Sequence, residues 1–316
     1  MGGARGIAAV LLYVFVHTGL AAVEDGTEGT PCAELAEIAE GVHVRPGVVG
    51  RVFVERQIAN IGFVIGTECV AVIDTGGSLE EGQALSCAIR RLTAVPVCYV
   101  INTHVHPDHI LGNLAFKGPG VHFIGHQNLP RAMALVGPTY LRRAARFAGQ
   151  AMDDERLIVP PERLVRPGQP LELDLGGRTL RIEAQGRAHT DSDLIVVDER
   201  SQTLWLGDLV FAGHIPVLDG SVLGWLQTLE TLRARTARQA VPGHGPPSVP
   251  WPGAAQDTMR YLSVLRNEVR EWIANDGTLQ GAQDHAGEAE RDRWALFDSY
   301  HKRNIAAAYR ELEWED

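Results

Sequence analysis

Seven histidine and aspartate side chains have the types and the spacing that hold divalent metal ions. Four of them fall within INTHVHPDHILGN, residues 101–113: His104, His106, Asp108 and His109. Imidazole nitrogens and carboxylate oxygens suit Zn²⁺ and related divalent ions. Alternate residues of an extended backbone point the same way, so His104 and His106 can bind one ion while Asp108 and His109 turn toward a second. The spacing therefore predicts a two-metal site.

Three more candidate ligands follow later in the chain, each where a strand-like run meets a loop. They are His189 in AHTDSD, Asp208 in LWLGDLVF and His244 in VPGHG. The alternative is structural: Asp108 caps a helix that begins near Ile110, and the histidines are merely exposed. Because a chance cluster would not be followed by further His and Asp residues at later strand ends, we favour the metal site.

The motifs THVHPDH, GRAHTDSD, GDLVF and PGHG occur in the order of the motifs of the metallo-β-lactamase superfamily, which the chain resembles from Asn60 to Gly245. The resemblance implies one ion on His104, His106 and His189, a second on Asp108, His109 and His244, and Asp208 bridging both. The set is similar to that of glyoxalase II, and it departs from lactamases with a Cys ligand because position 208 is Asp. Asp74, in VIDTGG, would support the site without touching metal.

This resemblance implies a hydrolase with two Zn²⁺ ions, while iron and manganese stay open. A hydroxide bridging the ions would attack a thioester, ester or amide bond of a small-molecule substrate, with Asp108 or Asp208 as catalytic proton carriers. Two alternatives remain. One is a mononuclear iron persulfide dioxygenase, which shares the HxHxDH motif, and the other is a non-catalytic metal-binding accessory protein.

A closer resemblance lies in the flanking segments ERQIANIGFVIG, GHIPVLDGSVLGWL and YHKRNIAAAYRELEWE. They look like the quinoprotein-associated zinc metallohydrolases, which implies a functional link to a quinoprotein dehydrogenase. The subfamily also agrees with export, because such dehydrogenases commonly work in the bacterial periplasm.

Residues outside the ligand motifs could contact a substrate. His214 follows Asp208 by six positions on a Gly-containing loop, which makes it a candidate for a substrate loop. Arg142, Arg143 and Arg146 form a basic group in a helical stretch. Such a group is usually a solvated helix face, but arginine forks also suit carboxylates of an anionic substrate.

The elements that must position these residues alternate between strand and helix patterns. Short β-branched runs broken by Gly and Pro occupy about 37–73, helical spacing follows at 78–92, and PVCYVINT is an apolar strand pattern. A helical stretch at 128–152 precedes strand-like runs within 171–205, and helical patterns close the chain at 254–265 and 294–312. This double alternation predicts an α/β protein of the metallo-β-lactamase fold, a four-layer αββα sandwich.

Composition and the N-terminal segment limit the classes of protein to which the chain can belong. A net charge of −10 argues against nucleic-acid binding, which needs a basic face. Residues 1–22 combine an early Arg, an apolar run and small residues near Ala21, which predicts a signal peptide before one hydrolase domain at 23–316. A membrane anchor is the alternative, but the run from Ile7 to Ala22 is short and interrupted by His17. We expect a secreted or periplasmic protein without a stable membrane span.

The four cysteines, Cys32, Cys69, Cys87 and Cys98, show no CxxC spacing. In an oxidising compartment one disulfide is expected. Cys69 and Cys98 lie in apolar strand-like runs, where a buried free thiol is the alternative. Spacing does not choose the pair.

Overall fold

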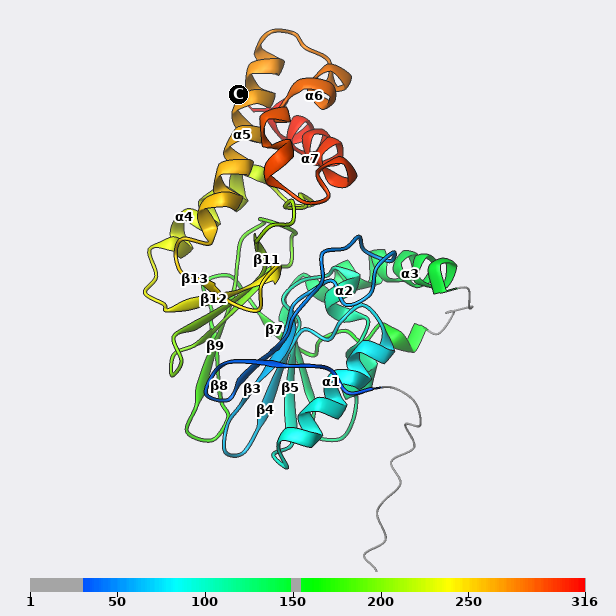
Figure 1. Cartoon of the computed structure of the whole chain (residues 1–316), viewed down its shortest axis with the longest axis vertical. Coiled ribbons are helices and arrows are strands. Elements are labelled where there is room, and N and C mark those ends of the chain that lie inside the picture. The colour runs from blue at the N-terminus through cyan, green and yellow to red at the C-terminus, as the bar shows by residue number, and fades with distance from the viewer. Residues whose placement is uncertain (1–30, 149–154, 316) are drawn as a thin grey trace, which may run out of the picture. The chain divides into compact units, whose positions relative to one another are not determined.

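Two β-sheets lie face to face at the centre of the protein (Figure 1). The computed structural model describes residues 31–148 and 155–315. The predicted signal peptide at 1–22 lies outside these residues. In the described part of the chain, no helix is long and apolar enough to cross a membrane.

The first sheet has seven strands in the order β1 to β7. Its strands are β1 (Ala36–Ala39), β2 (Val42–Arg45), β3 (Ile61–Ile65), β4 (Val70–Ile73), β5 (Val97–Ile101), β6 (His122–His126) and β7 (Arg163–Val165). Strands β1 to β4 pair antiparallel, whereas β4 to β7 pair parallel. The parallel part places the loop after β5, with its four candidate ligands, at the carboxyl edge of the sheet.

The second sheet has six strands in the order β13-β12-β11-β10-β9-β8. They are β8 (Leu171–Asp174), β9 (Thr179–Ala184), β10 (Leu194–Asp198), β11 (Thr203–Phe211), β12 (Gln239–His244) and β13 (Val249–Pro250). The only parallel pair among these strands is β11 with β12. It brings Asp208 and His244 to neighbouring strands.

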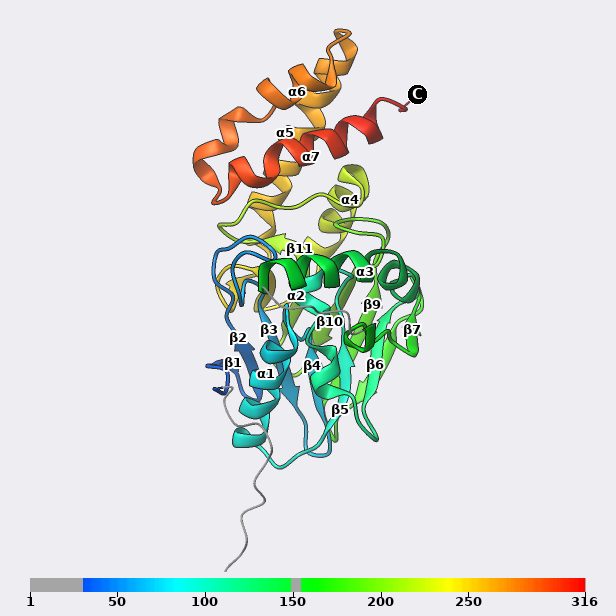
Figure 2. The ribbon, with the colours of Figure 1, turned by 90° about the vertical axis from the view of Figure 1, so that its right-hand side faces the viewer.

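The helices of the described residues are α1 (Leu79–Leu92), α2 (Pro107–Ile110), α3 (Leu129–Ala148), α4 (Val222–Arg233), α5 (Ala255–Ala274), α6 (Leu279–His285) and α7 (Phe297–Leu312). Helix α1 begins where the Ser78 hydroxyl accepts the Glu81 amide, with acidic residues in its first turn and basic residues in its last. Figure 2 shows α5, α6 and α7 together at one end of the sheets.

Side-chain alternation along the strands produces the layers. In β11, Trp205 faces the first sheet and packs in the cluster that contains Ile73 and Ile182. Its neighbours Leu204 and Leu206 face the other way, into a cluster with residues of α4 and α5. On the outer face of the first sheet, residues of β3 and β4 pack against α1. The predicted four-layer αββα fold is thereby confirmed.

The predicted helices and the observed ones differ mainly in the second half of the chain. Helix α5 runs to Ala274, beyond the predicted end at Leu265, and α4 and α6 carried no prediction. The structure describes α3 only to Ala148, so the predicted end at Met152 lies outside the described residues.

All four cysteines form disulfides, Cys32 with Cys87 and Cys69 with Cys98. The expectation of a single disulfide, with free thiols at Cys69 and Cys98 as the alternative, was therefore wrong. Strands β4 and β5 are parallel neighbours, and their register brings the Cα atoms of Cys69 and Cys98 to 5.5 Å. Disulfides persist in oxidising compartments, so the pairs indicate an extracytoplasmic environment.

Candidate metal centre

The structure brings all seven candidate ligands together at one end of the two sheets. The first four lie in the loop after β5 and in α2, while His189 lies between β9 and β10, Asp208 in β11 and His244 at the end of β12. They form two groups whose ligand atoms lie within 4.8 Å of one another: His104, His106, His189 and Asp208 in one, and Asp108, His109 and His244 in the other. His106 is half-buried and the others are buried.

The carboxylate of Asp208 lies between the two groups. Its Oδ1 is 3.2 Å from Nε2 of His109, and its Oδ2 is 3.4 Å from Nε2 of His189 and 3.4 Å from Nε2 of His244. One carboxylate therefore faces imidazoles of both groups, the position that a bridging ligand needs.

Several polar atoms of this cluster are buried and have no hydrogen-bond partner among the described residues. They are Nε2 of His104, Nε2 of His109, both carboxylate oxygens of Asp108 and Oδ1 of Asp208. Buried polar atoms in proteins almost always have partners. Divalent cations at the two groups would satisfy these atoms at once, so the residues fit a two-metal site.

The alternative role for Asp108 as a helix cap is wrong. Helix α2 begins at Pro107, with His106 at the capping position and no side-chain capping bond. Asp108 lies inside the helix instead of before it, and both of its carboxylate oxygens face the cluster without a hydrogen-bond partner.

Neighbouring charges and burial shift the pKa values of the cluster in both directions. Against the effect of burial, Asp208 raises the pKa of His109 and raises that of His244 to about 9. Burial would raise the pKa of Asp108, but His109 and His244 lower that pKa to about 2, so the carboxylate stays ionised. Burial and the neighbouring His109 hold the pKa of His104 well below its usual value, and burial lowers the pKa of His189 to about 3. These imidazoles are neutral, which is the form that binds metal.

Asp74 contacts the site from behind His109. The residue follows β4 in the left-handed region, with φ 56°. Its Oδ1 accepts the Thr103 amide at 2.8 Å, and its Oδ2 accepts the Thr103 hydroxyl at 2.7 Å and lies 2.8 Å from Nδ1 of His109. This contact leaves Nε2 of His109 facing the ligands, and Asp74 belongs to neither ligand group.

Asp219 plays the corresponding part for His106, and sequence analysis missed it. Its Oδ2 lies 2.8 Å from Nε2 of His106, which leaves Nδ1 of His106 3.0 Å from Nε2 of His189. The other oxygen of Asp219 accepts a hydrogen bond from Arg303 on α7. The partners of Asp219 are remote in sequence and no local motif marks it, although the segment GHIPVLDGSVLGWL contains it.

A cavity of about 180 Å³ opens onto the candidate ligands. Tyr140 and Arg143 of α3 line it, together with Tyr300 and Arg303 of α7 and the loop residue His214. Of the predicted basic group, only Arg143 lies on this wall among the described residues. Arg143 also makes no ion pair within 31–148 and 155–315, so its charge is available to a substrate.

His214, the candidate for a substrate loop, is buried against the site. Its ring stacks on His244 at 5.0 Å, and its Nδ1 donates to the Ile215 carbonyl at 2.6 Å. Burial and the neighbouring His244 lower the pKa of His214 to about 4, so the ring is neutral. His214 is in neither ligand group, and its place on the cavity wall allows contact with a substrate.

Comparison with known families matches residues 54–244, more than half of the chain, to the metallo-beta-lactamase superfamily. The chain belongs to the metallo-β-lactamase superfamily. This membership supports a metal-dependent hydrolase, and the described residues include a His/Asp cluster that could hold its metal ions.

Individual members of the superfamily are distant from this chain. A linear primary-alkylsulfatase from Pseudomonas sp. (strain ATCC 19151) is 30% identical over 98 residues, which is 28% of this chain and 19% of that enzyme. The chain thus spans about a fifth of the length of this curated relative.

Solved structures share the fold. The sec-alkylsulfatase Pisa1 from Pseudomonas sp. superposes with a TM-score of 0.66 and 17% identity, covering 90% of this chain and 51% of that chain. The metallo-beta-lactamase from Pontibacter korlensis superposes with a TM-score of 0.56 and 21% identity, covering 73% and 98%. At these identities the likeness supports the metallo-β-lactamase fold and does not extend to substrates.

Proposed function

We propose that this superfamily member is a dinuclear zinc hydrolase. One ion would be held by His104, His106 and His189. The other would be held by Asp108, His109 and His244, and Asp208 would bind both ions. The observation that carries the proposal is the pair of buried ligand groups on either side of Asp208, with five unpartnered polar atoms between them. Imidazole-rich sites with carboxylates suit Zn²⁺ better than Mg²⁺ or Ca²⁺, which prefer oxygen ligands.

Two bound ions would supply a hydroxide nucleophile near neutral pH and polarise the bond to be cleaved. The chain itself supplies proton transfer and orientation. Asp108 and Asp208 are ionised and line the cavity, so either carboxylate can accept the proton of the attacking water and then pass it to the leaving group. Burial raises the pKa of Tyr140, so its hydroxyl stays protonated and can donate to a substrate oxygen.

We infer a small-molecule substrate with a thioester, ester or amide bond, hydrolysed outside the cytoplasm after removal of a signal peptide at 1–22. The hydrolase domain would be 23–316, in the periplasm or secreted. Both disulfides support this compartment. The resemblance of the flanking segments supports a functional link to a quinoprotein dehydrogenase.

Sulfate-ester hydrolysis is a second candidate activity, favoured by one observation. The linear primary-alkylsulfatase is 30% identical to this chain over 98 residues. An alkyl sulfate therefore belongs among the substrates tested.

The test combines metal analysis with a substrate panel. The purified mature chain should carry two zinc ions per chain by mass spectrometry of its metals. It should turn over at least one class among thioesters, esters, lactones, β-lactams and alkyl sulfates. One iron per chain with persulfide oxidation would instead identify the dioxygenase. Exchangeable metal without turnover of any class would identify the accessory protein.

A further inference from the structure

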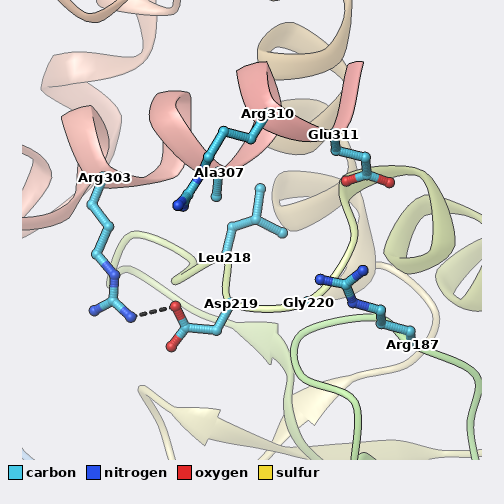
Figure 3. A pocket seen from close by; sticks show the side chains of 8 residues that line it. All are labelled: Arg187, Leu218, Asp219, Gly220, Arg303, Ala307, Arg310 and Glu311. Atoms are coloured by element: carbon cyan, nitrogen blue, oxygen red, sulfur yellow. Dashed lines mark hydrogen bonds and ion pairs between the residues drawn. The ribbon is translucent and has the colours of Figure 1, made fainter. Parts of the chain in front are cut away.

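A second cavity, of about 490 Å³, lies beside the metal centre between α7 and two loops of the second half of the chain (Figure 3). We call it the α7 cavity. Its wall includes Arg303 and Arg310 of α7, and Arg187 of the loop between β9 and β10. Figure 3 shows Arg303 and Arg310 descending from α7, with Arg187 entering from the opposite side. Three guanidinium groups therefore surround one space.

The carboxylates on the same wall are already engaged. Glu311 accepts the Ser221 hydroxyl through Oε1 and the Val222 amide through Oε2, at the start of α4. Asp219 is shared by Arg303 and His106. These contacts fix the positions of both carboxylates, and the wall carries three arginines against two carboxylates.

Two arginines of the α7 cavity are left without a carboxylate. Within 31–148 and 155–315, Arg187 forms no ion pair, and the Nε–H of Arg310 donates only to the Ala306 carbonyl at 3.1 Å. With three arginines against two carboxylates, the cavity wall has a net positive charge in a chain whose overall charge is −10. Such groups present parallel N–H donors that match the oxygens of carboxylate, sulfate or phosphate.

We propose that the α7 cavity binds an anionic group of this kind through Arg187 and Arg310. Leu218 and Ala307 give the cavity a partly apolar wall, which suits an anion attached to a short aliphatic segment. The anion has two sources: the far end of the substrate, or a free small anion. Arg303 and Asp219 line both cavities, so the two share a wall, and a substrate at the metal centre is within reach of the second. The substrate source rests on the proposed function.

Sulfate is the probe, because it offers tetrahedral oxygens and binds zinc weakly. Its affinity is measured by calorimetry on the full mature chain, with and without zinc, for wild type, R187A/R310A and the control R146A. Arg146 is an exposed arginine outside both cavities. We expect wild type and R146A to bind alike, and the double variant to bind roughly tenfold more weakly for each arginine removed.

Unchanged affinity in the double variant, or no sulfate binding by wild type, would overturn the site. R187K/R310K should recover part of the sulfate affinity, because lysine restores the positive charges but not the paired N–H donors of a guanidinium group. Since binding is measured without turnover and also without zinc, this result is independent of whether the hydrolase proposal holds.

Kinetics distinguish the two sources. A carboxylate-terminated ester and a neutral ester of the same length are compared in wild type and R187A/R310A. If the anion belongs to the substrate, KM rises for the carboxylate ester alone while kcat is retained. If the two esters respond alike while sulfate affinity falls, a free anion occupies the cavity. If sulfate affinity and both KM values are unchanged, the α7 cavity has no anion site.

Discussion

At the metal centre, the carboxylate of Asp208 is held in place by a close approach of backbone. A Cβ built on Gly243 would lie 1.8 Å from Oδ1 of Asp208, so only glycine fits at that position beside β11. Two parallel strands thus set the position of the carboxylate between the two ligand groups. Removing the carboxylate leaves the proposed ions with uncompensated mutual repulsion.

Asp208→Ala should therefore lose at least one zinc ion and most of the hydrolytic activity, while the fold survives. Metal content, turnover and circular dichroism measure the three effects. Asp292→Ala, at an exposed aspartate, is the control and should change none of them. Retention of both ions and full turnover by Asp208→Ala would refute the bridging assignment.

The hydrogen bonds of Asp74 lead to a separate prediction. Its Oδ2 accepts hydrogen bonds from two donors, the Thr103 hydroxyl and the His109 ring. In Asp74→Asn an amide group must meet one of these donors or leave it unpaired. We expect zinc affinity to fall roughly 10- to 100-fold, the usual scale for losing such support. Asparagine still tolerates the left-handed backbone, so the melting temperature should fall less than in Asp74→Ala.

Asp74→Ala separates support of the metal site from support of the turn. Alanine loses the hydrogen bonds and also tolerates φ 56° poorly, so both zinc affinity and melting temperature should fall. Zinc titration of the two metal-free variants makes the comparison. If both variants bind zinc as wild type does, Asp74 has no role at the site.

At the scale of elements, α7 holds the loop that carries Asp219. Buried Asn304 accepts the Leu218 amide at 2.9 Å and donates to the Pro216 carbonyl at 2.6 Å. The C-terminal helix therefore fixes the segment 216–219, and through Asp219 it fixes the ring of His106. Because α7 is distant in sequence from the ligand motifs, the sequence alone does not indicate that this helix supports the metal centre.

Asn304→Ala should lower the free energy of unfolding by about 2 kcal/mol, because a buried amide and a buried carbonyl lose their partner. Zinc affinity should fall as well, because the loop positions His106. Denaturant unfolding and zinc titration measure the two effects. The neighbouring exposed residue gives the control Lys302→Ala, which should leave both nearly unchanged. An Asn304→Ala protein with wild-type zinc affinity would show that α7 does not support the metal centre.

Sequence periodicity predicted the elements whose signals are local. Helix α1 carries its own cap at Ser78 and charges suited to its two ends, and the β5 strand is an apolar run. The convergence of the seven His and Asp residues could be predicted because their motifs adjoin strand-like runs, although Asp208 lies within β11 and not at the strand end that was expected. By contrast, the Cys69–Cys98 pair depends on strand register, and Asp219 on a residue of α7, so neither carries a local signal.

At the scale of the whole molecule, the proposed ligands tie one sheet to the other. His104 and His109 follow the first sheet, whereas Asp208 and His244 belong to the second. A ligand that binds only the folded chain stabilises it by about 4 kcal/mol when its concentration is a thousand times Kd. Metal bound here therefore contributes to the stability of the entire domain.

Removing metal from the wild-type chain with a chelator should accordingly lower its melting temperature, and added zinc should restore it. Scanning calorimetry measures the shift. The Asp208→Ala protein, which is expected to hold less metal, should respond less to the same chelator. A wild-type melting temperature that is insensitive to chelator and zinc would contradict a metal centre shared by the two sheets.

Export is the other prediction at this scale. The early Arg, the apolar run and the small residues before Val23 predict that the mature chain begins near Leu20 to Val23, outside the cytoplasm. Mass spectrometry of the protein from the periplasmic or culture fraction gives the mature N-terminus. An intact N-terminus on a cytoplasmic protein would contradict export.

The order of the sheets along the chain has a consequence for maturation. Residues 36–165 build the first sheet and residues 171–250 build the second, so each sheet is one continuous stretch of sequence. The HxHxDH segment is complete long before Asp208 and His244 have been synthesised. A nascent chain can therefore offer at most part of the proposed coordination shell. Completion of the proposed two-metal site would thus be a late event, which follows the packing of the second sheet on the first.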